Sequence, residues 1–166
     1  MPNIEAVSYE EVKRRVNIAL NEFIEKETPL LARDVSERTL TGALANYLRS
    51  EFPLWDVNPE FNRMWKDGKN VPKNLPSKPT RMPGKTGNVS PDIIIHKNGD
   101  APNSNLLVIL AKKESNVDSE GEEDMQDLPD YINELGYKYG LFIQFKVKDN
   151  AGKRPTGMWF PSEERL

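Results

Sequence analysis

Acidic and basic side chains stand at the ends of two short apolar runs in the middle of the chain. Asp92 comes directly before the first run, residues 93–95, and the pair Lys112-Lys113 follows the second run, residues 106–110. Aliphatic runs of this length, bounded by turn residues, predict two buried strands of one hairpin. The hairpin would bring an acid and a lysine together. Such groups can hold a divalent metal ion and orient a water molecule for hydrolysis of a phosphodiester.

The motif in these two runs resembles that of the PD-(D/E)XK nuclease superfamily. Its signature is Pro-Asp at the start of one strand, and an acid, any residue and a lysine on the next. Pro91-Asp92 matches the first half, and Leu110-Ala111-Lys112 occupies the second half. Leu110 stands where the family has Glu or Asp, and it would share a face with Lys112 because side chains alternate along a strand. The resemblance implies Mg²⁺ or Mn²⁺ as cofactor, DNA as substrate, Asp92 as a metal ligand and Lys112 as the residue that orients the water.

The leucine at position 110 predicts that hydrolysis is strongly reduced or lost, since it supplies no oxygen to a metal that prefers oxygen ligands. Three other acids are candidates to substitute for it. Glu114 has the strand parity of positions 110 and 112, and Glu60 lies on the preceding predicted strand as either a ligand or a rim acid. Glu37 falls on the apolar side of a predicted helix near its start. It either pairs with the helix dipole or, as the resemblance implies, contributes to the metal site.

Two non-catalytic interpretations remain open beside the nuclease. The chain could keep the fold as a module that binds nucleic acid or a protein partner. It could also be an ordinary domain in which Asp92 and Lys112 form an ion pair. A homodimer is a further expectation from the resemblance, because related nucleases often pair to cut both strands.

The charge is distributed unevenly along the chain, although the net charge is only −3. Residues 63–88 hold seven basic side chains and one acid, whereas residues 114–134 hold nine acids and neither Lys nor Arg. A basic segment attracts polyanions, while a solvated loop is the simpler interpretation. The candidate nucleic-acid contacts are Arg63, Lys66, Lys69, Lys73 and Lys85.

The composition excludes several classes of function. The chain has no Cys and one His, so disulfides, Cys-ligated metals and a His-rich metal site are excluded. No apolar run approaches the roughly 18 residues of a membrane span. Residues 1–10 lack the features of a signal peptide, so a cytoplasmic location is the expectation.

The spacing of apolar residues predicts one domain, residues 1–166, of the α/β class. An N-terminal helix within residues 1–30, ending at Pro29, would pack on a core that spans residues 34–147. The core would contain a helix after Asp34 or Ser36, strands at 52–63, 93–95 and 106–110, a helix starting near Leu128, and a strand at 139–145. A long basic loop, 64–90, would interrupt it, and an edge strand at 156–160 would follow. This αβββαβ order, a mixed central sheet flanked by helices, matches the restriction-endonuclease-like core.

Overall fold

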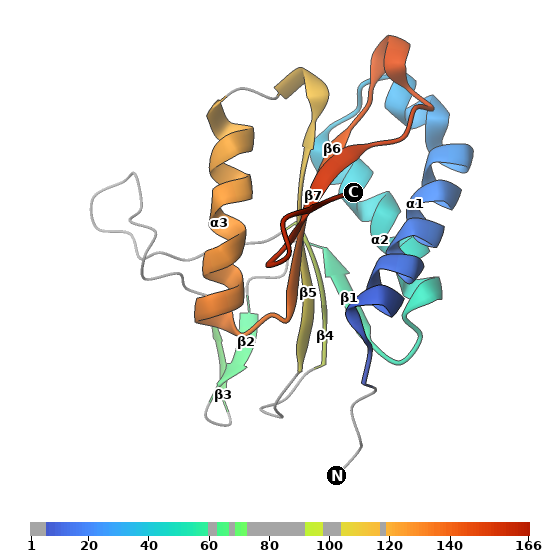
Figure 1. Cartoon of the computed structure of the whole chain (residues 1–166). Helices are drawn as coiled ribbons and strands as arrows, with labels where there is room; N and C mark the ends of the chain where they lie inside the picture. Colours follow the sequence, from blue (N-terminus) through green and yellow to red (C-terminus); the bar gives the residue numbers. More distant parts are fainter. Residues whose placement is uncertain (1–5, 60–62, 67–68, 73–91, 98–103, 117–118) are drawn as a thin grey trace.

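The strands that the sequence predicts assemble into one mixed sheet with helices on both faces (Figure 1). The computed structural model describes residues 6–59, 63–66, 69–72, 92–97, 104–116 and 119–166. The strands of the sheet, in spatial order, are β1 (Asp56–Pro59), β4 (Ile93–His96), β5 (Asn105–Lys113), β6 (Tyr139–Phe145), β7 (Thr156–Phe160) and β8 (Glu164–Arg165). The β5–β6 pair is parallel, and the other neighbouring pairs are antiparallel. The predicted α/β class and the β4–β5 hairpin pairing are confirmed.

The helices form a layer on each side of this sheet. Helices α1 (Tyr9–Ala32) and α2 (Glu37–Glu51) cover one face, and α3 (Ser119–Leu135) covers the other (Figure 1). Parallel strands cannot be joined by a tight turn, and α3 is the crossover that returns the chain from the end of β5 to the start of β6. Among the described residues, no helix is both long and apolar enough to cross a membrane.

Alternation along the strands divides the core into two clusters. Ile93, Ile109 and Ile143 pack with α1 and α2, whereas Val108 and Phe142 belong to the cluster that packs with α3. All five side chains are buried. The central strands therefore read as continuous apolar runs because both faces are covered.

Helix α1 is longer than the sequence predicted. Ser8 caps its start by accepting a hydrogen bond from the N–H of Glu11, as expected. The helix does not end at Pro29 but continues to Ala32, with a break at Glu27, where φ is −109° and ψ is 16°. Pro29 thus lies in the first turn after the break, where its missing N–H costs little.

Helix α3 also begins earlier than predicted. The acidic segment after β5 was expected to be a loop leading to a helix near Leu128, but α3 begins at Ser119 and contains Pro129. A proline inside a helix costs roughly 3 kcal/mol. Burial of Leu128, Tyr131 and Leu135 against the sheet offsets that cost. The helix ends before Gly136, whose φ of +73° suits the predicted helix stop.

The segment between α2 and β4 departs from prediction in two ways. The predicted strand 52–63 is only the four residues of β1, and its edge position agrees with the presence of Pro59. The predicted loop 64–90 overlaps an antiparallel hairpin of β2 (Arg63–Lys66) and β3 (Lys69–Pro72). Residues 73–91 lie outside the described part of the chain.

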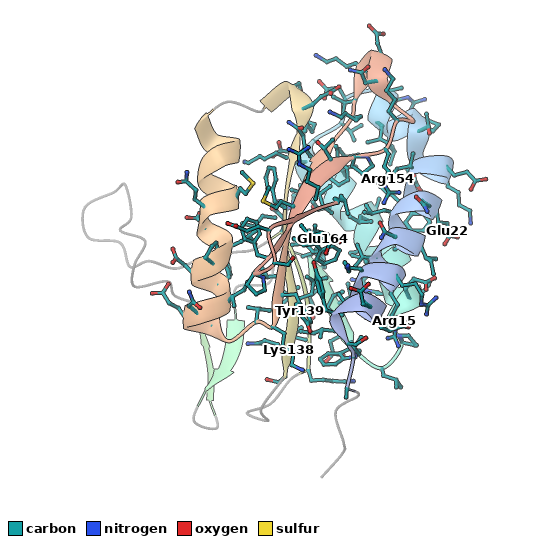
Figure 2. The ribbon with its side chains drawn as sticks, in the orientation of Figure 1. Arg15, Glu22, Lys138, Tyr139, Arg154 and Glu164 are labelled. Atoms are coloured by element: carbon teal, nitrogen blue, oxygen red, sulfur yellow. The ribbon has the colours of Figure 1, made fainter. Side chains whose placement is uncertain are left out.

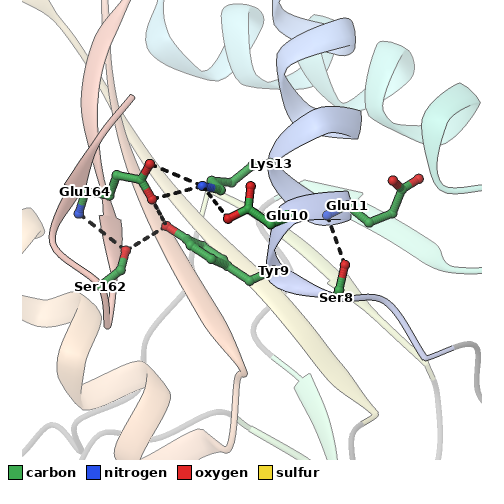
Figure 3. Close-up of polar contacts among 7 residues, drawn as sticks. All are labelled: Ser8, Tyr9, Glu10, Glu11, Lys13, Ser162 and Glu164. Carbon is green, nitrogen blue, oxygen red and sulfur yellow. Dashed lines mark hydrogen bonds and ion pairs between the residues drawn. The ribbon is translucent and has the colours of Figure 1, made fainter.

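The C-terminal strands tie the two ends of the chain together. β7 was predicted as the edge strand, but β8 pairs with its outer side. From this region Ser162 and Glu164 contact the start of α1 at Tyr9 and Lys13 (Figure 3). Arg154, before β7, donates to two asparagine side chains of α1 (Figure 2).

Candidate functional site

Among the described residues, β5 extends beyond the start of β4; this stretch of β5, residues 111–113, together with Asp92 and Glu37, is called the notch. Ile93, the first residue of β4, pairs with Ile109, while β5 continues to Lys113. On its other side β5 remains paired with β6 as far as Phe145. Among the described residues, 111–113 therefore have a strand on one side only, and their backbone groups on the β4 side bond to other partners.

Two carboxylates supply those partners. The N–H of Ala111 donates to Asp92 Oδ2 at 2.7 Å, and the N–H of Lys113 donates to Glu37 Oε1 at 3.1 Å. The two N–H groups are two residues apart on one strand, a separation of about 7 Å. Asp92, at the entry to β4, and Glu37, at the start of α2, thus follow one another along the edge of β5. The sequence-predicted residues Asp92 and Glu37 thus both bind the backbone at the same edge of β5.

Lys112 lies between these two anchoring points. Its Nζ is 3.8 Å from Glu37 Oε2, with side-chain exposures of 20% for Lys112 and 24% for Glu37. Because both groups are partly exposed, water screens their attraction. Glu37 is the first residue of α2, whose N-cap is Ser36, so the helix dipole also favours its negative charge.

Leu110 occupies the motif position of the second acid, but its side chain does not present a polar group to the notch. It is 6% exposed and belongs to the apolar cluster on the α3 side, together with Phe142, Leu128 and Tyr131. The side chain brings no donor or acceptor, and packing with α3 excludes water from its position. Position 110 therefore contributes to core packing in this chain.

Glu114, the nearest substitute acid in the sequence, is engaged elsewhere. Its carboxylate accepts hydrogen bonds from the Asn150 side chain at 3.0 Å and the Val147 N–H at 3.2 Å, and it pairs with Lys146 at 3.5 Å. The Asn150 bond is the main cause that lowers the pKa of Glu114 below its ordinary value. Glu114 therefore fixes the turn after β6 instead of replacing the missing acid.

A second ion-pair group borders the notch on the α1–α2 side. Asp34 pairs with Lys113 at 3.1 Å and with Lys148 at 3.5 Å. The contact with Lys113 is the main cause that lowers the pKa of Asp34. Asp34 was expected as a possible helix cap, but Ser36 has that role. No local sequence pattern predicts the pairing of Asp34 with these lysines, because both lysines are distant along the chain.

The structure describes only some of the remaining predicted residues. The side chain of His96 is hydrogen-bonded to Asn58 Oδ1 at 2.8 Å, which agrees with the structural role expected of it. Of the basic candidates, three have their backbone in the β2–β3 hairpin: Arg63, Lys66 and Lys69. Glu60, Lys73 and Lys85 lie outside the described residues.

The donors present are compatible with a hard divalent cation. Asp92 and Glu37 supply carboxylate oxygens, and Mg²⁺ is commonly held by one or two carboxylates while it keeps several waters. Within the described ranges, however, no group of three or more His, Cys, Asp or Glu residues could hold a metal. In the described part of the chain, Asp92 and Glu37 could contribute oxygen ligands to such a cation but do not by themselves form a metal cluster of that size.

Comparisons with known proteins do not add a family to this geometry. No protein-family model matches the chain, and neither a curated protein nor a solved structure matches it significantly.

Proposed function

We propose that this protein is a restriction-endonuclease-like DNA-binding protein whose metal-dependent phosphodiesterase site is impaired by Leu110. The observation that carries the proposal is the notch beside β5, where Asp92 and Glu37 bind successive backbone N–H groups on either side of Lys112. Carboxylates and an ammonium in one partly exposed place are the groups that phosphodiester hydrolysis requires.

The order of elements supports the same proposal. Helix α2 is followed by β1, β4 and β5, then by α3 and β6, and the four strands are neighbours in that order within the sheet. This is the αβββαβ order expected for the fold, with the β2–β3 hairpin inserted between the first two strands. The candidate residues sit on α2, at the start of β4 and on β5, which are the elements that the resemblance assigns to the site.

Each residue has a chemical role in the proposal. Asp92 and Glu37 would hold a Mg²⁺ or Mn²⁺ ion, which when bound would activate water and neutralise phosphate charge. Lys112 would orient the attacking water or bind a phosphate oxygen. Leu110 leaves the site one acid short, so cation affinity and hydrolysis would both be low.

A non-catalytic binding module is the second candidate, and the burial of Leu110 favours it. The side chain is integrated into the cluster under α3, and both carboxylates already satisfy the backbone of β5. In this alternative the notch would bind a phosphate without cleaving the chain.

Restoring the acid tests the proposal. Leu110→Glu is expected to increase Mn²⁺ affinity in calorimetry and to give or increase nicking of a supercoiled plasmid. Leu110→Gln is the matched control, because Gln has the size of Glu without its charge. Both variants should lose roughly 2–4 kcal/mol of stability, since a polar group replaces a buried leucine.

The outcomes separate the two candidates. A folded Leu110→Glu protein that binds Mn²⁺ no better than Leu110→Gln would refute the impaired-nuclease proposal. Asp92→Asn in the Leu110→Glu background should remove any gain. If DNA binding persists without any gain of metal affinity, the binding module is the correct interpretation.

A further inference from the structure

The α3 side of the sheet changes from apolar to polar near the notch. Strand register sets Leu110 beside Phe142, and Phe142 beside Met158. Two residues further towards the notch, Lys112 lies beside Gln144, and Gln144 beside Thr156. Residues directly opposite one another on paired strands project from the same face. Lys112, Gln144 and Thr156 therefore form one polar row across β5, β6 and β7.

A hydrogen bond within this row orients the Gln144 amide. The Thr156 hydroxyl donates to Gln144 Oε1 at 2.9 Å. A glutamine amide has one oxygen acceptor and an NH₂ group with two donors. With its oxygen held towards β7, the amide directs its NH₂ group away from β7. In the described part of the chain, Thr156 is the hydrogen-bond partner of the Gln144 side chain.

The row places two kinds of donor beside each other. Lys112 carries a charge and is 20% exposed at its side chain, Gln144 is half-buried, and Thr156 is exposed. A phosphate oxygen accepts hydrogen bonds from both ammonium and amide groups, and amide contacts fix its position without adding charge. Without the orientation set by Thr156, the Gln144 amide would bind water as readily as an acidic ligand.

We propose that Lys112 and Gln144 together bind a phosphate of the DNA backbone, and that Thr156 positions the Gln144 amide for this contact. This rests on the proposed function, since it assigns a phosphate subsite next to the same notch. Lys112 supplies the charge, and Gln144 supplies neutral hydrogen bonds that fix the phosphate relative to Asp92 and Glu37. Thr156 touches no DNA itself and acts through Gln144.

Salt dependence of DNA binding distinguishes these roles. The full chain is titrated with a fluorescein-labelled DNA duplex at several salt concentrations, without divalent metal, and affinity is read by anisotropy. Gln144→Ala should weaken binding about two- to tenfold, as expected for loss of a neutral hydrogen bond, with an unchanged slope of log affinity against log salt. Lys112→Ala should reduce that slope by about one, because a phosphate charge is no longer neutralised.

Thr156 variants test the positioning role. Thr156→Val, which keeps the shape but removes the hydroxyl, should weaken binding about as much as Gln144→Ala, and the double variant should lose no more than either alone. Thr156→Ser keeps the hydroxyl and should bind like the parent protein. Thermal unfolding of each variant serves as the folding control, and both side chains are exposed enough that the fold should be retained.

Two results overturn the inference, and they differ in what they imply. If the parent protein binds DNA and Lys112→Ala lowers the slope, but Gln144→Ala and Thr156→Val bind normally, the amide subsite is wrong while the proposed function stands. If the parent protein does not bind the duplex even at low salt, the proposed function and the subsite both fail.

Discussion

At the scale of single residues, the carboxylates of the notch have structural work to do even without a cation. Asp92 and Glu37 accept hydrogen bonds from the N–H groups of Ala111 and Lys113. No described strand pairs with these N–H groups on the β4 side of β5. A buried N–H without a partner costs about 1–3 kcal/mol. The two acids therefore contribute to folding in a chain with Leu110, whether or not they also take part in chemistry.

The pH dependence of stability should reveal the neighbouring carboxylate, Glu114. Its pKa is lowered in the folded protein, chiefly by the hydrogen bond from Asn150. A depressed pKa stabilises the fold above the unfolded value of 4.5, and this contribution is lost as the pH falls through the folded value. Glu114→Gln should thus be less stable by about 1 kcal/mol at neutral pH, and the difference should shrink in acid.

Urea denaturation of both proteins across the acid range measures this difference. Glutamine keeps an oxygen acceptor for the Val147 and Asn150 donors, so the comparison isolates the charge. A stability difference of constant size from neutral pH to well below the ordinary pKa of Glu would show that the carboxylate charge is not the cause.

At the scale of elements, sequence patterns predicted buried strands better than helix ends. The apolar runs of β4, β5 and β6 predicted buried strands, and the hairpin pairing of β4 with β5 followed from the turn residues between them. Pro29 predicts the end of α1 and Pro129 predicts a start of α3 near Leu128, but α1 resumes after a break at Glu27 and continues to Ala32, and α3 begins at Ser119 with Pro129 inside it. Local propensity is a weak guide where packing decides.

The candidate site divides in the same way. The hairpin motif predicted that Asp92 and Lys112 would come near one another, and the helix pattern singled out Glu37. The Gln144–Thr156 bond depends on the register between strands that are separated by a turn, and the binding of Glu37 to the Lys113 N–H depends on where β4 begins. Neither register nor strand length is encoded in a short motif.

The tight packing of β7 on β6 gives a test at this scale. A Cβ on Gly157 would lie 2.0 Å from the Phe142 carbonyl oxygen, so Gly157→Ala requires the backbone to move and should cost roughly 1–3 kcal/mol or more. The matched control is Gly42→Ala in α2, where an added Cβ meets no atom within 4 Å. That change should stabilise by about 0.5–1 kcal/mol, since Gly is a poor helix former.

Chemical denaturation of the two alanine variants measures both effects. The expected result is opposite signs for the same substitution, destabilising at Gly157 and stabilising at Gly42. Equal effects at the two positions would mean that β7 does not approach β6 as closely as described. If the proposed phosphate contact exists, Gly157→Ala should also weaken DNA binding by more than its loss of stability explains, because Thr156 is adjacent.

At the scale of the whole molecule, contacts between the two ends of the chain complete the α1 side of the sheet. The Tyr9 ring lies 5.2 Å from the ring of Tyr139 and 6.0 Å from that of Trp159. Its hydroxyl bonds to Ser162 at 2.6 Å and donates to Glu164 at 3.0 Å (Figure 3). The first helix is therefore held in part by the last residues of the chain.

A double-mutant cycle measures how strongly the ends are coupled. Tyr9→Phe keeps the ring contacts and removes only the hydroxyl, and Glu164→Gln removes the charge that also pairs with Lys13 at 3.0 Å. Tyr9→Phe should lower stability by about 0.5–1.5 kcal/mol, Glu164→Gln should lower it as well, and together they should lose less than the sum, because both break the same bond. Additive losses would mean that the hydroxyl and the carboxylate act independently.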